Sequence, residues 1–331
     1  MLFAGSCGTL RMRKGFTKMT AHTVKRIGRI CCFWLLGSAL LAVGCGVTSP
    51  AGGVGGNTGG TNLTALEQLS LERINRARLK PAAEAALYGI SLNEGVPAGQ
   101  QITAAPKQAL SVNSTLTQVA RDHSQDMLTR NYFAHDTPEG VTPFQRIQAA
   151  GYPFLAAGEN LAWRGDTVPI DPPQVVEQQH VDLFVDSTVA DRGHRTTMLQ
   201  DVFREIGVGI LRGNFTDGGI VYDSIMQTQD YGEPVTDSVF VLGVIYTDSN
   251  NNGQYDYGEG QQNVGVTLGG VTKTTNVGGG YSFEVLQPGS YTLQFAPGPS
   301  TNLTVNAGSL NIKVDLVNNT NVVINLGLGP L

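Results

Sequence analysis

Residues 158–162 read Gly-Glu-Asn-Leu-Ala, and residues 193–199 read Gly-His-Arg-Thr-Thr-Met-Leu. Two more clusters belong with them. Residues 133–135, before both stretches, read Phe-Ala-His, and residues 183–187, between the two, read Leu-Phe-Val-Asp-Ser. Histidines and carboxylates in such clusters can ligate a metal or form an acid–base pair. Spacing alone does not show that the clusters meet in the fold, so the elements that carry them have to be considered.

Helical periodicity surrounds these clusters. Leu116, Ala120, His123 and Met127 form one apolar stripe that predicts a helix ending near Asn131. Further helices are expected from the capping box at Thr64 to just before Pro81, over residues 142–150 and over residues 173–186. Alternating residues predict strands at 206–211 and 219–229. Helices followed by a β-meander predict an α+β fold for residues 63–234.

The order of four motifs resembles the CAP/SCP superfamily, which includes cysteine-rich secretory proteins, antigen 5 and plant pathogenesis-related proteins. These motifs are Phe-x-His, Gly-x-x-Pro-x-x-Arg-Ile, Gly-Glu-Asn and Gly-His-Arg, and they are most similar to the bacterial branch. The resemblance implies an α-β-α sandwich with a large cleft. It also implies a cleft tetrad of two histidines and two acids, of which His135, Glu159 and His194 match three members.

The fourth tetrad position departs from the family pattern. The family often places an acid three residues after a tryptophan, but here Phe184 stands for the tryptophan and Ser187 for the acid. Asp186 is the expected substitute, although it would point about 100° away from Ser187 on an ideal helix. His123 and His180 lie on apolar helix faces, so we expect both to be core histidines.

Composition changes after about Pro234. Helical patterns end, and short β-rich runs separated by Gly and Asn turns follow at residues 239–246, 264–268, 281–285, 291–295 and 322–326. These runs predict a small all-β sandwich over residues 238–331.

Residues 248–259 fit the calcium-loop pattern D-x-[DN]-x-[DN]-G-x5-E. The expected oxygen ligands are Asp248, Asn250, Asn252, the carbonyl of Gln254, Asp256 and Glu259. With only three carboxylates, the site should bind calcium with modest affinity. The alternative is a solvated Asn/Gly-rich turn. The flanking sequence resembles the B-type repeats of bacterial surface adhesins, which implies a Cna-B-like sandwich stiffened by calcium.

The N-terminus has the pattern of an export signal. A basic segment precedes the apolar run of residues 30–43, which is too short for a comfortable membrane span. The following Leu-Ala-Val-Gly-Cys resembles a lipobox, so residues 1–44 are expected to be a lipoprotein signal peptide and Cys45 the lipidated residue. The alternative is an ordinary signal peptide with a chance cysteine. Residues 46–62 are Gly-rich and read as a flexible tether.

All 27 acidic residues follow Cys45, whereas seven of the 22 basic residues precede it. The acidic exported part would repel phosphate backbones, so nucleic acid is not an expected partner. Cys45 is also the only one of the four cysteines outside the signal, which leaves no intramolecular disulfide.

The function expected from these features is a membrane-anchored protein, facing the periplasm or the cell exterior, whose CAP cleft binds a lipid, sterol or glycan. In one form of this cleft, His135 and His194 hold a zinc ion. The alternatives are a metal-assisted peptidase or esterase with Glu159 as base, and a purely adhesive surface protein. The sequence holds no H-E-x-x-H motif, and Ser187 lacks the context of a nucleophile. Binding is therefore favoured over catalysis.

Overall fold

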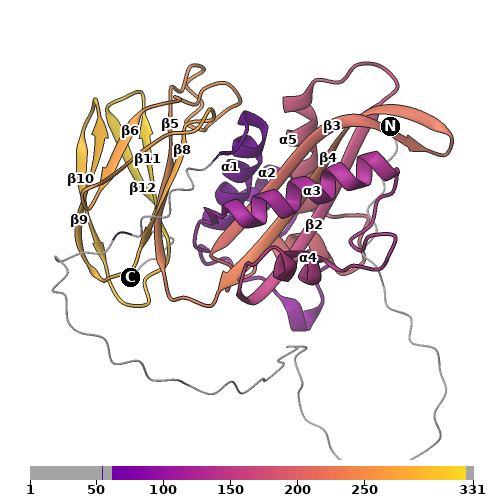
Figure 1. Ribbon diagram of the computed structural model, residues 1–331, viewed down its shortest axis with the longest axis horizontal. Helices are drawn as coiled ribbons and strands as arrows, with labels where there is room; N and C mark the ends of the chain where they lie inside the picture. Colours follow the sequence, from indigo (N-terminus) through magenta and orange to yellow (C-terminus); the bar gives the residue numbers. More distant parts are fainter. Residues whose placement is uncertain (1–53, 55–61, 326–331) are drawn as a thin grey trace, which may run out of the picture. The chain divides into compact units, whose positions relative to one another are not determined.

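The computed structural model describes residue 54 and residues 62–325. The expected signal peptide, Cys45 and nearly all of the tether lie outside these residues. A mixed region of helices and strands runs to Pro234, and an all-β region follows it (Figure 1). This confirms the expected fold class, α+β with a β-sandwich after it. In the described part of the chain, no helix is both long and apolar enough to cross a membrane.

The mixed region contains α1 (Ala65–Leu79), α2 (Pro81–Leu87), η1 (Ala98–Gln100), β1 (Ser111–Val112), α3 (Ser114–Arg130), α4 (Pro143–Ala149), β2 (Phe154–Asp166), α5 (Pro172–Val185), α6 (Gly193–Met198), β3 (Glu205–Asp217) and β4 (Ile220–Pro234). The all-β region contains β5 (Val239–Tyr246), β6 (Gly265–Leu268), β7 (Val271–Thr274), β8 (Gly280–Val285), β9 (Gly289–Ala296), β10 (Ser300–Val305), β11 (Ile312–Val317) and β12 (Asn321–Asn325).

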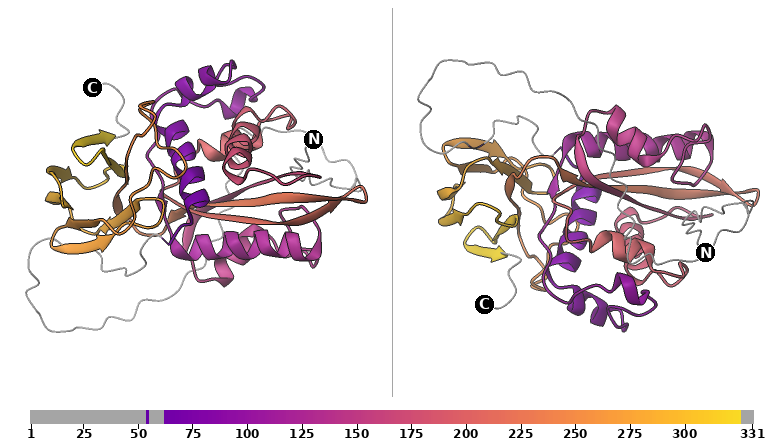
Figure 2. Two further views of the ribbon diagram at one scale, coloured as in Figure 1. Left: turned by 90° about the horizontal axis from the view of Figure 1, so that it is seen from above. Right: turned by 90° about the horizontal axis from the view of Figure 1, so that it is seen from below.

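The mixed region is a three-layer sandwich. Its sheet has the order β1-β3-β4-β2, so β2 is an edge strand. Helix α3 covers one face, while α1, α5 and α6 lie on the other (Figure 2). Two glycines of β3 allow α3 to lie directly on the sheet. A Cβ at Gly207 would lie 2.0 Å from the carbonyl carbon of Leu116, and one at Gly209 would lie 2.3 Å from that of Ala120.

The helix ends follow local capping chemistry. Thr64 and Glu67 form the expected capping box at the start of α1. Asn131 closes α3 in the left-handed conformation with φ 54°. Pro81 ends α1 as expected and also begins α2, because its missing N–H costs nothing in a first helical turn.

The all-β region consists of two four-stranded sheets with the orders β10-β9-β6-β7 and β12-β11-β5-β8. Apolar residues from both sheets form one core cluster, which includes Val266, Phe283, Phe295 and Val314. The expected runs correspond to β5, β6, β8, β9 and β12. The sequence did not single out β11, in which Lys313 and Asp315 interrupt the apolar residues. Both of these charged side chains are buried against the mixed region.

Candidate functional site

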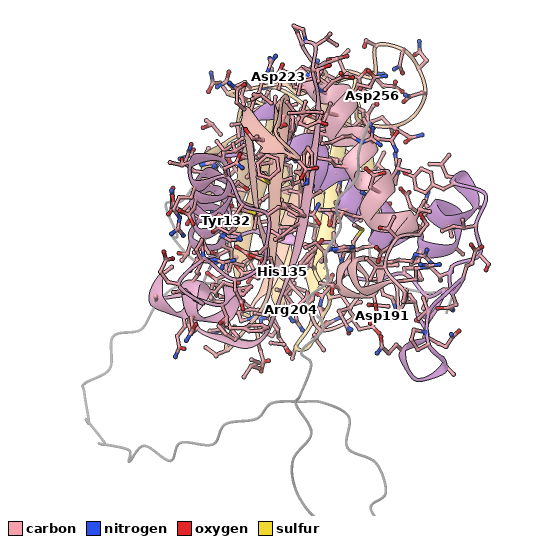
Figure 3. The ribbon with its side chains drawn as sticks, turned by 90° about the vertical axis from the view of Figure 1, so that its right-hand side faces the viewer. Tyr132, His135, Asp191, Arg204, Asp223 and Asp256 are labelled. Atoms are coloured by element: carbon pink, nitrogen blue, oxygen red, sulfur yellow. The ribbon has the colours of Figure 1, made fainter. Side chains whose placement is uncertain are left out.

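A buried carboxylate on the edge strand organises the first half of the site. The Oε1 atom of Glu159 lies 2.7 Å from Nδ1 of His135, a residue in the segment between α3 and α4. Arg146 of α4 forms an ion pair with the second oxygen of Glu159 and donates to the carbonyl of His135 at 2.7 Å. Only 2% of the Glu159 side chain is exposed, against 25% for His135. The histidine is therefore the accessible end of this group (Figure 3).

The second half pairs His194 with Asp186. Asp186 Oδ1 lies 2.8 Å from the Nδ1 of His194, and its Oδ2 accepts from the His194 backbone N–H at 2.8 Å. Asp186 does not continue α5 but caps it in the left-handed conformation with φ 53°. The direction expected for the Asp186 side chain was wrong, because an ideal helix does not continue through this residue. Phe184 is fully buried, whereas Ser187 is exposed.

Both pairs are tied to neighbouring residues of β2. Glu159 contacts His135, and the adjacent Asn160 donates to the backbone carbonyl of His194 at 3.1 Å. Successive side chains of a strand point to opposite faces, so the two pairs reach β2 from its two sides. No contact joins His135 to His194 within residues 62–325, and the structure brings the four residues together as two pairs.

The donor geometry fits metal ligation only in part. Both imidazoles direct Nδ1 to a carboxylate, which leaves Nε2 as the atom for a ligand, as in histidines that bind zinc. Zinc sites in proteins use three or four side chains. The described residues hold no cluster of three or more His, Cys, Asp or Glu side chains arranged for a metal ion.

Asp230 is a site residue that the sequence analysis missed. It lies on β4 directly opposite Glu159 and is fully buried. Neither of its carboxyl oxygens meets a hydrogen-bond donor among the described residues when both acids are ionised. Burial raises the pKa of Asp230 well above its ordinary value, and the carboxylate of Glu159 raises it further. A protonated Asp230 supplies the donor that two facing carboxylates lack. The available signal was the polar run Gln-Thr-Gln-Asp at 227–230 within a long strand.

A cavity of about 190 Å³ opens beside the second pair. Its walls come from the edge strand β2, the last two turns of α5 and the segment after α5. The lining residues are Leu161, Ala162, Trp163, Val181, Asp182, Leu183, Val185, Asp186, Ser187, Thr188 and His194. Six of these eleven residues are apolar, and the polar ones include the His194–Asp186 pair and Asp182, which pairs with Arg164.

His123 and His180 are core residues, as expected. His180 Nε2 lies 2.8 Å from the carboxylate of Glu84, and His123 Nε2 lies 3.0 Å from the carbonyl of Ala134. Burial lowers the pKa of both histidines.

The structure also brings the side chains of the expected calcium loop together. Asp248 accepts from the backbone N–H groups of Asn252 and Gly253, and Gly253 has φ 74°. The amides of Asn250 and Asn252 reach Asp256 Oδ2 at 2.8 Å and 2.6 Å. Of two other loop residues, the side chain of Glu259 is engaged within the loop and that of Gln254 outside it. Glu259 accepts from the backbone N–H groups of Ser249 and Asp256, and Gln254 pairs with Arg76.

The raised pKa of Asp230 gives a pH signature. The unfolded acid loses its proton near its ordinary pKa of 3.8, whereas the folded acid keeps it. Folding of the native chain therefore weakens as pH rises above 3.8, and Asp230→Asn removes this loss. The variant should match the native chain near pH 4 and become more stable by about 1.4 kcal/mol per pH unit above it, up to the folded-state pKa.

Urea unfolding at several pH values from 4 to 8 measures this difference. Asp217→Asn, at an exposed aspartate, is the control and should show no such trend. A constant difference between Asp230→Asn and the native chain across this range would contradict the protonated state.

Comparisons with known proteins identify a family for the mixed region. Residues 71–231 match the sequence model of the family described as CAP, the cysteine-rich secretory protein family. The chain is 35% identical over 100 residues to the uncharacterized protein YkwD of Bacillus subtilis, and 30% identical over 103 residues to its uncharacterized membrane protein YlbC. These alignments cover 30% and 31% of this chain but only 34% and 26% of the two relatives.

Two solved structures are similar at lower identity. One is an extracellular protein containing an SCP domain from Bacillus anthracis, at 23% identity and TM-score 0.30, covering 50% of this chain and 41% of the other. The second is the venom allergen-like protein 4 of Schistosoma mansoni, at 14% identity and TM-score 0.32, covering 53% and 92%. On the family match over residues 71–231, this chain carries a CAP domain of the cysteine-rich secretory protein family.

Proposed function

We propose that this chain is an exported, lipid-anchored protein whose CAP domain binds an amphipathic lipid or sterol. The observation that carries the proposal is the cavity at the free edge of β2, with apolar walls and a histidine–acid pair at one end. At about 190 Å³ the cavity is smaller than the roughly 300–1,000 Å³ of usual ligand pockets, so it would hold only one end of an acyl chain or ring system, against Leu161, Trp163 and Leu183. A hydroxyl or headgroup oxygen would meet the Nε2 atom of His194. Pockets of this kind bind through apolar walls and a few fixed polar groups.

Binding is better supported than hydrolysis. A hydrolase needs a nucleophile, or a water held by a base that faces the substrate. The Glu159 carboxylate is buried and occupied by His135 and Arg146. Ser187 lines the cavity, but no histidine of the described residues forms a hydrogen bond with it, and the nearby His194 is paired with Asp186. These contacts favour a rigid receptor for a ligand over a reacting centre.

Zinc is a separate part of the proposal. A zinc ion would bind through the Nε2 atoms of His135 and His194, which their carboxylate partners leave available. This requires the two imidazoles, which reach β2 from its two sides, to turn toward each other around the edge of that strand. Water or the bound ligand would complete the coordination, so the ion would be exchangeable.

The lipid proposal can be tested through Trp163, which lines the cavity. Dibrominated stearate should quench its fluorescence, because bromine quenches an indole only at close range. Thr188→Phe places an aromatic ring at an exposed position of the cavity lining and should weaken binding at least tenfold. The matched control is Ala190→Phe, an exposed position outside the lining, which should bind normally. Equal quenching of the native chain and Thr188→Phe would refute this cavity as the site.

We also propose that the all-β region is a calcium-stiffened platform of the kind found in adhesin repeats. The turn at Gly253 and the backbone hydrogen bonds to Asp248 support this proposal, because a calcium loop needs a sharp turn at this position. Extracellular modules of this type bind calcium with a Kd of roughly 10⁻⁴–10⁻³ M. Calcium at a hundred times its Kd should then stabilise the fold by about 2.7 kcal/mol.

Calorimetry of chelator-treated protein measures this effect as a rise in Tm on adding calcium. Asp248→Ala should abolish the rise, because it removes the carboxylate at the first ligand position. Gln254→Ala should keep it, because Gln254 contributes its backbone carbonyl. If the native chain gives neither calcium heat nor a higher Tm, the loop is only a turn.

Export and anchoring complete the proposal. The basic and apolar N-terminus supports export, and the extracellular protein of Bacillus anthracis is a similar chain in that compartment. Cys45 would carry the lipid. Expression of Cys45→Ser should move the protein from the membrane fraction to the soluble exported fraction, whereas Cys7→Ser should fractionate normally. Unchanged membrane fractionation of Cys45→Ser would rule out this anchor.

A further inference from the structure

A second and larger cavity, of about 580 Å³, lies away from the site at β2. Its roof is formed by α1 and α2. Its floor is the face of the sheet formed by β5, β11 and β12, which points away from the β-sandwich core. Side chains alternate along these strands, so Lys313 and Asp315 of β11 and Asn321 and Asn325 of β12 all reach the same cavity. The volume falls within the range of small-ligand sites in proteins.

The charges in this cavity neutralise one another. Four basic and four acidic side chains line it. Lys313 Nζ lies 2.9 Å from Glu72 Oε2 and 2.5 Å from Asp315 Oδ1, and all three side chains are buried. Arg76 pairs with Glu84 at 2.7 Å. Six of these eight side chains form ion pairs among the described residues, and only Lys80 and Asp248 do not. A charged ligand would therefore find few free counter-charges, and the cavity favours a neutral one.

The other lining side chains include both amides, which can form hydrogen bonds, and apolar groups. The amides of Asn321 and Asn325 stand on the floor, and Asn321 is exposed. Leu79 and Leu87 lie on the roof, where Leu87 keeps 60% of its surface exposed. A sugar ring has the matching chemistry, with hydroxyl groups around its edge and C–H groups on its faces. We propose that this cavity binds a short neutral oligosaccharide.

Two other ligand classes fit less well. A lipid chain would have to lie against the ionised group of Glu72, Lys313 and Asp315, which burial in hydrocarbon would penalise. A charged peptide would find free counter-charges only at Lys80 and Asp248. The oligosaccharide site uses neither β2 nor the two histidine–acid pairs, so its success or failure is independent of the lipid site.

The test uses the purified full chain and substitutions in α2. Ala83 lies at an exposed position of the roof and lines the cavity. Ala83→Trp should fill the space without disturbing a core contact. The matched control is Ala82→Trp, at the neighbouring exposed position outside the lining. Asn321→Ala removes one amide from the floor.

Binding is measured by retention on an array of neutral and anionic glycans, and by calorimetry with chitotetraose and maltotetraose. We expect the native chain and Ala82→Trp to bind neutral glycans equally, with binding reduced at least tenfold in Ala83→Trp and about fivefold in Asn321→Ala. The proposal is overturned by absent retention of neutral glycans, by preference for anionic glycans, or by retention that Ala83→Trp leaves unchanged. Binding of Thr188→Phe tells the two cavities apart, because that variant alters only the site at β2.

Discussion

The carboxylate of Glu159 is the constraint on which the CAP domain depends. A buried charge is costly unless it is paired and hydrogen-bonded, and here the segment after α3 and helix α4 both supply partners. Glu159 stands on an edge strand, so its neighbours are fixed on only one side by β4. The ion pairs of Glu159 hold His135 and Arg146 at the edge of the sheet. They thereby position the chain between α3 and β2. Removing either partner would leave one oxygen of the buried carboxylate without its partner.

A second buried charge links the mixed region to the β-sandwich. Lys313 of β11 lies between Glu72 of α1 and Asp315 of its own strand. Burial disfavours its charge, but the two carboxylates outweigh this and raise its pKa. Nearby, Arg73 of α1 joins Glu177 of α5 to Asp256 in the loop of residues 248–259. The loop therefore rests against the CAP domain through ion pairs, and one oxygen of Asp256 is engaged on that side.

The sequence predicted secondary structure where a local signal, such as a capping residue or an apolar stripe, was present. Capping residues and apolar stripes predicted α1, α3, α4 and α5, since these signals act within a few residues. Strand β2 escaped prediction, because its motif residues Gly158 to Asn160 do not alternate between apolar and polar. Helix α6 is only six residues long and carries His194, so it offered no periodic stripe. Strand β11 was not predicted, because Lys313 and Asp315 interrupt its apolar pattern. Lys313 pairs with Asp315 and with Glu72 of α1, which is far away in the sequence.

The sequence by itself determined the fold class, the CAP resemblance and three members of the histidine–acid site, because motif order and residue type carry this information. Only the tertiary structure decided how those members pair. The left-handed cap at Asp186 turns its carboxylate onto His194, and the register of β2 against β4 sets Asp230 beside Glu159. The first pairing depends on one backbone angle at Asp186, and the second on the contact of two strands far apart in the chain. Neither produces a periodic pattern in the sequence.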